Sequence, residues 1–303
     1  MSDLILHHFD WSPYAEKVRV LLGIKRLAWR SVQIPMVMPK PDLTALTGGY
    51  RKTPVLQIGA DIYCDTSCIA RELETRYPAP TFFPAGASGL EYALAAWAER
   101  FFTSGAGLSM GLNDQLPADL VRDRREFFSH MDFAQFAERT PHMFGQVLAN
   151  AALVEEQLGD GRAFFMGDRP GLSDASAYYV LWMCRGFIAS ANDLLQPFTR
   201  TAAWEARMRE VGHGQRSEME AAEALAIARS SVPEPGRGVP AGDPSGLRKG
   251  QNVIVTPDDY GKDPVMGELL TLDHQRISVR RLDERAGEVV VHFPRLGYVV
   301  AAS

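Results

Sequence analysis

Apolar positions in the first eighty residues follow two spacings, one typical of strands and the other typical of helices. The short run Leu4-Ile5-Leu6 predicts a buried strand. A helical face follows it, made of Tyr14, Val18, Leu21 and Leu22. A second strand is predicted at residues 55–58, before a helix on which Ile69 and Leu73 share a face. This order of strand, helix, strand and helix indicates an α/β domain over residues 1–80.

From Leu90 to about Arg229 the apolar spacing is helical. The preceding series ends at Tyr77-Pro78-Ala79-Pro80, and the Pro, Gly and Ser residues of 84–89 indicate a linker. The clearest apolar faces carry Trp97, Phe101 and Phe102, and later Val147, Leu148, Ala151, Val154 and Leu158. The pattern therefore predicts an all-helical domain, which we place at residues 87–229.

The periodicity changes from helical spacing to alternation near the end of the chain. Residues 230–246 are so rich in Pro and Gly that we expect a linker, part extended and part flexible. Short β-branched runs follow at residues 253–255, 269–272, 277–279, 289–291 and 298–300. So many short strands in so few residues predict a small all-β barrel, SH3-like or OB-like, at residues 247–303.

Composition is that of an ordinary soluble globular protein. The 303 residues are 46% hydrophobic and 23% charged, with a net charge of −5. We expect no nucleic-acid partner, because no dense Lys/Arg cluster appears and acidic neighbours offset the arginines of the predicted barrel. We also expect no signal peptide, membrane span or metal site. The three cysteines suit a reducing cytoplasm.

Ser12 is the first candidate for chemistry, because Ser12-Pro13 stands where the first helix should begin. Backbone N–H groups converge at a helix N-terminus and its dipole favours negative charge. A thiol placed beside Ser12 would therefore ionise more readily than a free thiol of pKa about 8.5. The alternative is that Ser12 is only a helix cap, which is the commoner role of such serines.

The segment Lys52-Thr53-Pro54 precedes the second strand and is the second candidate. A cis Thr53–Pro54 bond would turn the backbone of Thr53 outward as an edge to which an extended peptide can pair. The alternative is a trans proline that merely starts the strand, since cis X–Pro bonds are a minority of about 5–6%. The sequence leaves this choice open.

Asp65-Thr66 opens the next predicted helix and is the third candidate. The hydroxyl and the N–H groups at this helix start suit a carboxylate, and the side chain of Asp65 suits an α-ammonium. Together they would fit the end of one amino acid. Ordinary capping is again the alternative.

These segments together resemble the cytosolic glutathione transferase superfamily. Residues 4–23 resemble its first strand and helix, and Lys52-Thr53-Pro54-Val55-Leu56 resembles its cis-proline segment. Asp65-Thr66-Ser67-Cys68-Ile69 resembles its glutathione-carboxylate motif. Residues 165–175 resemble the buried helix start of its second domain, where an aspartate bonds a capping hydroxyl. The resemblance covers about residues 1–228 and implies a thioredoxin-like domain followed by a helical domain.

Three positions depart from the family pattern. Thr66 replaces a serine but keeps the hydroxyl, and Gly171 replaces a Ser or Thr, so we expect the cap there to lose its side chain at a cost of a few tenths of a kcal/mol. Ser12 stands where the members that exchange thiols carry cysteine. This favours polarisation of glutathione's own thiol over a mixed disulfide on the enzyme.

The resemblance implies a cytoplasmic glutathione transferase with glutathione as co-substrate, a hydrophobic electrophile as second substrate and a homodimeric state. Ser12 would be catalytic. Glutathione would be bound by Tyr14, Lys52, Thr53, Pro54, Asp65 and Thr66. Trp97 and Phe101 are candidates for the electrophile pocket, although a place in the helical core is the commoner role of residues in such an apolar stripe. The alternative function is a non-catalytic scaffold of the same fold that acts through a protein partner.

The predicted C-terminal barrel lies outside the basic transferase fold. It could recognise a partner, as small barrels often do. We favour a second interpretation, in which it packs on the helical domain and closes part of the pocket or an inter-subunit edge. A barrel this small buries little core by itself, so docking would help to stabilise it.

Overall fold

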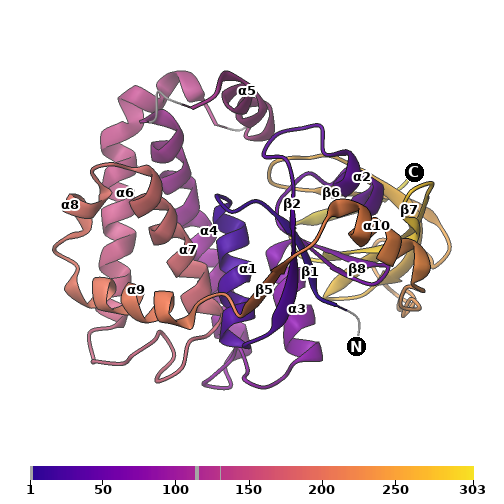
Figure 1. Cartoon of the computed structure of the whole chain (residues 1–303), viewed down its shortest axis with the longest axis horizontal. Coiled ribbons are helices and arrows are strands. Elements are labelled where there is room, and N and C mark those ends of the chain that lie inside the picture. Colours follow the sequence, from indigo (N-terminus) through magenta and orange to yellow (C-terminus); the bar gives the residue numbers. More distant parts are fainter. Residues whose placement is uncertain (1–2, 113–115, 130) are drawn as a thin grey trace.

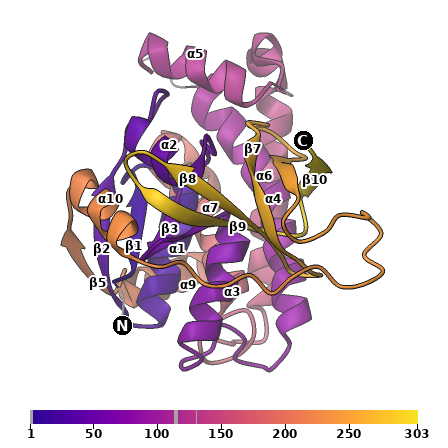
Figure 2. The same cartoon turned by 90° about the vertical axis from the view of Figure 1, so that its right-hand side faces the viewer.

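The computed structural model describes residues 3–112, 116–129 and 131–303 (Figures 1 and 2). Its first domain has the predicted thioredoxin-like order of strands and helices. The elements are β1 (Ile5–His8), α1 (Pro13–Ile24), β2 (Ala28–Gln33), α2 (Pro41–Thr47), β3 (Val55–Ile58), β4 (Asp61–Cys64) and α3 (Thr66–Arg76). Strand β1 pairs in parallel with β2 and antiparallel with β3, which pairs antiparallel with β4. Both strands predicted in this region are therefore confirmed.

The central strands are buried on both faces, and their side chains alternate between two cores. Leu56 and Tyr63 belong to a core shared with α1, α3 and the helical domain. Val55 and Ile62 belong to a second core, which lies against α2 and the C-terminal strands. Two covered faces explain why these strands read as continuous apolar runs.

The helical domain lies against α1 and forms one end of the molecule, opposite the C-terminal strands (Figure 1). Its elements are α4 (Ser88–Gly111), α5 (Ala118–Phe127), η1 (Phe133–Gln135), α6 (Phe136–Gln157), α7 (Leu172–Phe187), α8 (Ala191–Leu195) and α9 (Thr199–Val211). Helix α7 is buried along nearly its whole length, between α1 and α4. This arrangement confirms the predicted all-α domain.

The N-terminus of α7 is capped in a way that the sequence did not indicate. Gly171 has no capping side chain, but Oε2 of Glu91 on α4 accepts a hydrogen bond of 2.7 Å from the backbone N–H of Ser173. A Cβ atom on Gly171 would lie 2.3 Å from Oε1 of Glu91, so the glycine makes room for this carboxylate. The cap lacks its own side chain, as predicted, and a carboxylate from another helix takes its place. Asp174 accepts from the backbone N–H of Gly171 at 2.9 Å, where the family resemblance implied a capping hydroxyl.

After α9 the chain returns to the first domain. Strand β5 (Gln215–Glu218) pairs in parallel with β2, and α10 (Ala221–Ser230) follows it. The expectation of helix up to Arg229 missed this strand. The four residues of β5 are polar and exposed, so they carry no apolar periodicity by which a strand can be detected.

All five C-terminal strands that the sequence predicts are present. They are β6 (Asn252–Pro257), β7 (Val265–Leu272), β8 (Arg276–Asp283), β9 (Gly287–Pro294) and β10 (Tyr298–Ala302). The sheet they form does not stand apart, because β9 pairs in parallel with β4. The described residues therefore share one sheet in the order β10-β6-β7-β8-β9-β4-β3-β1-β2-β5. Figure 2 shows the C-terminal strands beside the strands of the first domain.

Polar contacts between β4, α3 and the C-terminal strands reinforce this pairing. His292 on β9 bonds Asp61 on β4 at 2.8 Å, and Arg276 on β8 forms a buried ion pair with Glu72 on α3. We call residues 252–302 the β domain below. We expected these strands to pack on the helical domain. The β domain instead packs mainly against the first domain, and one of its loops also contacts α5.

Candidate functional site

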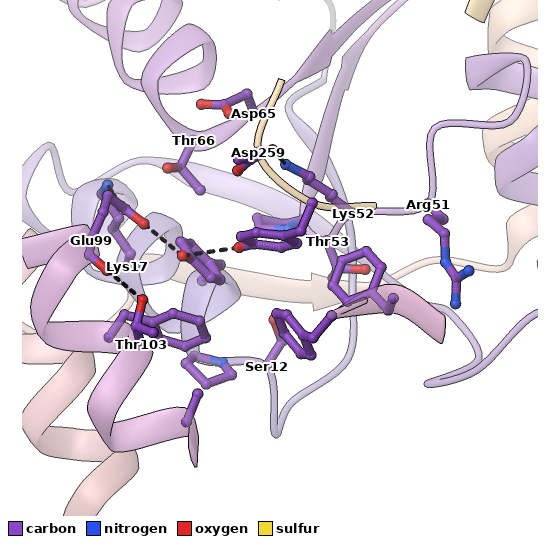
Figure 3. A pocket seen from close by; sticks show the side chains of 18 of the residues that line it. Ser12, Lys17, Arg51, Lys52, Thr53, Asp65, Thr66, Glu99, Thr103 and Asp259 are labelled. Carbon is purple, nitrogen blue, oxygen red and sulfur yellow. Dashed lines mark hydrogen bonds and ion pairs between the residues drawn. The ribbon is translucent and has the colours of Figure 1, made fainter. Parts of the chain in front are cut away.

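A cavity of about 970 Å³ opens between the first domain, the helical domain and the β domain (Figure 3). Each of the polar positions that the sequence singled out lies on its wall. These residues are Ser12, Tyr14, Lys52, Thr53, Pro54, Asp65 and Thr66. The three separate segments of the sequence are thus brought to one place.

Ser12 is the N-cap of α1, as its sequence context predicts. Its hydroxyl oxygen accepts a hydrogen bond of 3.2 Å from the N–H of Ala15, and its own N–H donates to the carbonyl of Phe9 at 3.1 Å. The side chain is buried at the base of the cavity. A group that reached Ser12 would therefore meet a hydroxyl and the positive end of the helix dipole.

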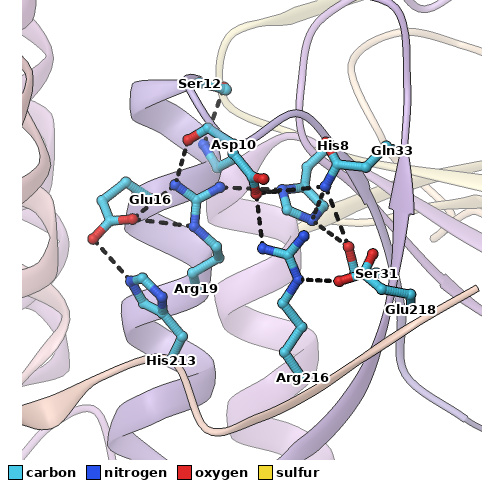
Figure 4. Close-up of polar contacts among 11 residues, drawn as sticks. His8, Asp10, Ser12, Glu16, Arg19, Ser31, Gln33, His213, Arg216 and Glu218 are labelled. Carbon is cyan, nitrogen blue, oxygen red and sulfur yellow. Dashed lines mark hydrogen bonds and ion pairs between the residues drawn. The ribbon is translucent and has the colours of Figure 1, made fainter.

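A buried arginine holds the loop that leads to Ser12 (Figure 4). Arg19 donates to the backbone carbonyl of Asp10 at 2.9 Å and pairs with Glu16 at 2.7 Å. It also bonds Nδ1 of His8 at 3.1 Å, and burial together with this cation lowers the pKa of His8 to about 3. The loop is thus attached to its own helix, which restricts the position of Ser12.

Residues in and beside β5 also contact this network of polar side chains. Arg216 pairs with Asp10 at 2.8 Å, and His213 bonds Glu16 at 3.0 Å. The returning chain therefore supports the Ser12 loop as well as the edge of the sheet (Figure 4).

The Thr53–Pro54 peptide bond is cis, which answers the question that the sequence left open. Lys52 turns toward the β domain, where its ammonium pairs with Asp259 at 2.6 Å and lies over the ring of Tyr260. Thr53 and Pro54 therefore face the cavity beside a lysine that is already paired (Figure 3).

A group of cations lies next to Thr53. The ammonium of Lys40 donates to the hydroxyl of Thr53 at 3.2 Å, and Arg51 and Arg124 share the carboxylate of Asp123 at 2.6 and 2.5 Å. Burial and the neighbouring Arg124 lower the pKa of Lys40 to about 8. Because Arg51 and Arg124 share the carboxylate of Asp123 and the ammonium of Lys40 donates, among the described residues, only to a hydroxyl and a carbonyl, this side of the cavity suits an anion.

Asp65 begins α3 with a backbone φ of +78°, which few residues other than glycine adopt. One carboxylate oxygen accepts from the N–H and the hydroxyl of Ser67 at 2.8 and 2.7 Å. The other accepts from the hydroxyl of Tyr298 on β10 at 3.2 Å. Thr66 follows as the first helical residue and lines the cavity. Strained backbone of this kind is concentrated at binding sites.

Tyr14 lies in the first turn of α1 and packs against the rings of Phe102 and Tyr179. Its hydroxyl donates to Glu99 on α4 at 2.5 Å and accepts from the hydroxyl of Tyr260 at 3.2 Å. Burial raises the pKa of both phenols. Tyr14 thus lines the cavity while its hydroxyl is held by residues of two other domains.

Trp97 and Phe101, the two residues predicted for the electrophile pocket, do not line the cavity. The indole of Trp97 donates to Asn150 on α6 at 2.9 Å, and Phe101 is fully buried in the helical core. The cavity face of α4 is offset around the helix from these two residues. Its members include Ala95, Glu99, Phe102 and Ala106. The remaining apolar wall is formed by residues such as Phe127, Phe128, Phe133, Met183 and Phe187.

Sequence reasoning missed Lys40, Glu99 and Tyr260. Glu99 interrupts an apolar helical face, and Tyr260 is an aromatic residue in a loop, so each carried a weak signal. Lys40 carried none, since its only distinguishing feature is a following proline.

Cys64 and Cys68 lie near this site but are buried, and burial raises the pKa of both thiols, that of Cys68 to about 12. Neither suits a disulfide exchange that needs a thiolate. Among the described residues no three His, Cys, Asp or Glu side chains are grouped to hold a metal ion. Within the same ranges, no helix combines the length and apolar character needed to cross a membrane.

Comparisons with known proteins agree with this geometry. The family model for the glutathione S-transferase N-terminal domain matches residues 6–81, and that for the C-terminal domain matches residues 136–207. A GST-like protein from Pseudomonas syringae is 38% identical over 100% of both chains, with a TM-score of 0.82. The match includes the β domain, which that protein therefore shares.

More distant structures match about two thirds of this chain. A glutathione S-transferase from Rhodospirillum rubrum is 21% identical, with a TM-score of 0.51 over 68% of this chain and 87% of that one. A glutathione transferase family member from Pseudomonas fluorescens, solved with two glutathione molecules bound, is 13% identical, with a TM-score of 0.52 over 68% and 88%. These two support the fold alone. No curated protein matches the sequence significantly.

Proposed function

We propose that this chain, which belongs to the cytosolic glutathione transferase superfamily, binds glutathione in the cavity and activates its thiol for attack on a hydrophobic electrophile. One observation carries the proposal. Ser12, at the N-terminus of α1, lines the same cavity as the cis-proline segment and the Asp65-Thr66 helix start.

Glutathione would lie extended across the first domain. Its cysteinyl backbone would pair with Thr53 beside Pro54, and its γ-glutamyl end would meet Asp65 and Thr66. Its C-terminal carboxylate would then approach Lys40, whose ammonium lies 3.2 Å from the hydroxyl of Thr53. Tyr14 and Lys52 would flank the bound peptide, since both line the cavity.

In this pose the sulfur faces Ser12. The hydroxyl and the dipole of α1 stabilise the thiolate relative to the thiol. The thiolate attacks an electrophile held against the apolar wall formed by the helical domain. Phe102 on α4 and Phe187 on α7 belong to that wall, which takes the place that we first assigned to Trp97 and Phe101.

The cellular setting follows from the family alone. We infer a cytoplasmic enzyme that acts as a homodimer, without nucleic-acid or membrane partners. Size-exclusion chromatography with light scattering tests the oligomeric state, and a single species of about 33.5 kDa would contradict the dimer.

The proposal is tested by turnover of glutathione with a generic aromatic electrophile. Ser12→Gly removes the hydroxyl and keeps a good N-cap residue, so the helix start should lose only a few tenths of a kcal/mol. We expect kcat/KM to fall about 10²-fold. Ser176→Ala is a matched control, because its hydroxyl bonds the backbone of its own helix. Absence of turnover in the wild type, together with capture of a specific protein, would support the scaffold alternative.

A further inference from the structure

A chain of hydrogen bonds connects the β domain to α4 through the cavity. The hydroxyl of Tyr260, in the loop between β6 and β7, donates to the hydroxyl of Tyr14 at 3.2 Å. The hydroxyl of Tyr14 donates to Oε2 of Glu99 at 2.5 Å. All three residues line the cavity that contains Ser12, and the side chain of Glu99 is 40% exposed (Figure 3). This series of hydrogen bonds therefore connects the buried part of the cavity to solvent.

Each member of this chain is held in place from several sides. The ring of Tyr260 packs against Phe127 and Phe128 near the end of α5, at centroid distances of 5.2 and 4.9 Å. Its neighbour Asp259 pairs with Lys52, which fixes the loop to the first domain. Contacts among residues of three domains thus fix the positions of these hydroxyl groups relative to one another.

Charged and titratable groups surround the hydrogen-bonded series Tyr260, Tyr14 and Glu99, and they come from each element that packs against it. Glu99 is approached by the ammonium of Lys17 on α1 at 3.4 Å and by the hydroxyl of Tyr179 on α7 at 3.5 Å. Within the described ranges, the charged groups that face Tyr260 include Glu99, Asp259, Lys52 and Asp65. Helix α5 contributes aromatic rings at this contact.

We propose that Tyr260, Tyr14 and Glu99 form a proton path that carries the thiol proton of glutathione away from the sulfur. The thiol proton passes to the oxygen of Tyr260 while the phenol proton of Tyr260 passes to Tyr14. The phenol proton of Tyr14 passes to the carboxylate of Glu99, which releases it to water. The S–H bond breaks, one O–H bond forms on Glu99, and both phenols end as they began, protonated.

After this step donor and acceptor are exchanged in each hydrogen bond, and the exchange provides the thiolate with a donor. Tyr260 now donates to the thiolate and Tyr14 donates to Tyr260, because a phenol oxygen can both accept and donate. Burial raises the pKa of both phenols, so both stay protonated at neutral pH before and after the step. Tyr260 is thereby a catalytic residue contributed by the β domain, while Tyr14 and Glu99 act through it. The inference rests on the proposed function, since it requires glutathione's sulfur near Ser12.

The test is the rate at which the thiolate absorbance appears when enzyme and glutathione are mixed in a stopped-flow instrument between pH 5 and 9. We expect Tyr260→Phe, Tyr14→Phe and Glu99→Gln each to slow this appearance about 10²-fold. Tyr260→Phe should also raise the pH midpoint of the bound thiol by about one unit, because the thiolate loses a donor. Glutathione affinity of Tyr260→Phe, measured by calorimetry at about pH 5 where the thiol keeps its proton, should change little.

Two comparisons separate a proton path from a structural role. Tyr178→Phe removes the same atom from another buried phenol, and it should behave as the wild type. The double variant Tyr260→Phe/Tyr14→Phe should be no slower than either single variant, because one break interrupts the path.

Unchanged rates and midpoints in the single variants, with a normal thiolate band in the wild type, would overturn the path and leave the proposed function intact. Additive losses in the double variant would overturn it as well. A wild type that binds glutathione but shows no thiolate band would instead overturn the proposed function, and the path with it.

Discussion

The hydroxyl of Tyr298, on the last strand of the chain, donates a hydrogen bond to Oδ2 of Asp65 at 3.2 Å. It also bonds the hydroxyl of Tyr50 at 3.1 Å. The β domain therefore orients the carboxylate that we assign to the γ-glutamyl end of glutathione. This contact makes the C-terminal strands part of the proposed binding site and not only an appended module.

Tyr298→Phe should weaken glutathione binding about tenfold, since a hydrogen bond to a charged group contributes roughly 1.5 kcal/mol or more. The ring remains, so the packing of β10 should be kept. Calorimetric titration with glutathione measures the effect, and Tyr178→Phe serves as the control that loses a buried phenol elsewhere. An unchanged dissociation constant would mean that Asp65 needs no help from the β domain.

Gly171→Ser, which restores the residue type usual in the family, should destabilise this protein. The new side chain would meet the Glu91 carboxylate that caps α7, and such overpacking costs about 1–3 kcal/mol. Chemical denaturation measures the free energy of unfolding.

The matched variant for this prediction is the double change Gly171→Ser/Glu91→Ala. It removes the clash with the carboxylate, although the new Cβ still lies 2.9 Å from the carbonyl oxygen of Phe82. The serine should therefore cost less stability in the Glu91→Ala background than it does in the wild type. If Gly171→Ser alone proves as stable as the wild type, Glu91 is not the cap that we describe.

Stability should fall as the pH is lowered from about 6.5 to 5. Burial lowers the pKa of His7 to about 4 and that of His8 to about 3, from ordinary values of 6.5. In this range the unfolded chain binds protons at both histidines and the folded chain does not, so protonation favours unfolding. Each histidine should contribute up to about 1.4 kcal/mol per pH unit. Asp174 offsets part of this slope, because burial raises its pKa to about 7 and the folded chain binds a proton there in the same range.

Denaturation curves recorded at several pH values measure this slope. His8→Asn should reduce it, because one of the two histidines no longer titrates in the unfolded chain. An equal slope in the wild type and in His8→Asn would show that His8 is not buried as a neutral group.

Local patterns in the sequence predicted the elements whose residues are apolar and the caps that start them. Ser12 caps α1 and Asp65 caps α3, as expected from residue types alone. Strand β5 escaped prediction because its residues are polar, and its place depends on the open edge of β2. No local pattern shows such an edge.

Long-range pairing accounts for the rest of what was missed. The register of β4 and β9 aligns Asp61 with Val290, two residues far apart in the sequence. From this pairing follow the position of Tyr298 beside Asp65 and that of Tyr260 beside Tyr14. The polar residues of the first domain were therefore predictable, whereas the wall contributed by the β domain was not.

The measurement that tests the central claim most directly is an ultraviolet difference spectrum of the protein titrated with glutathione at neutral pH. The account predicts a saturable thiolate band in the wild type and its loss in Ser12→Gly, with glutathione still bound. Saturable binding without the band, or a band that Ser12→Gly leaves unchanged, would contradict activation of the thiol by Ser12.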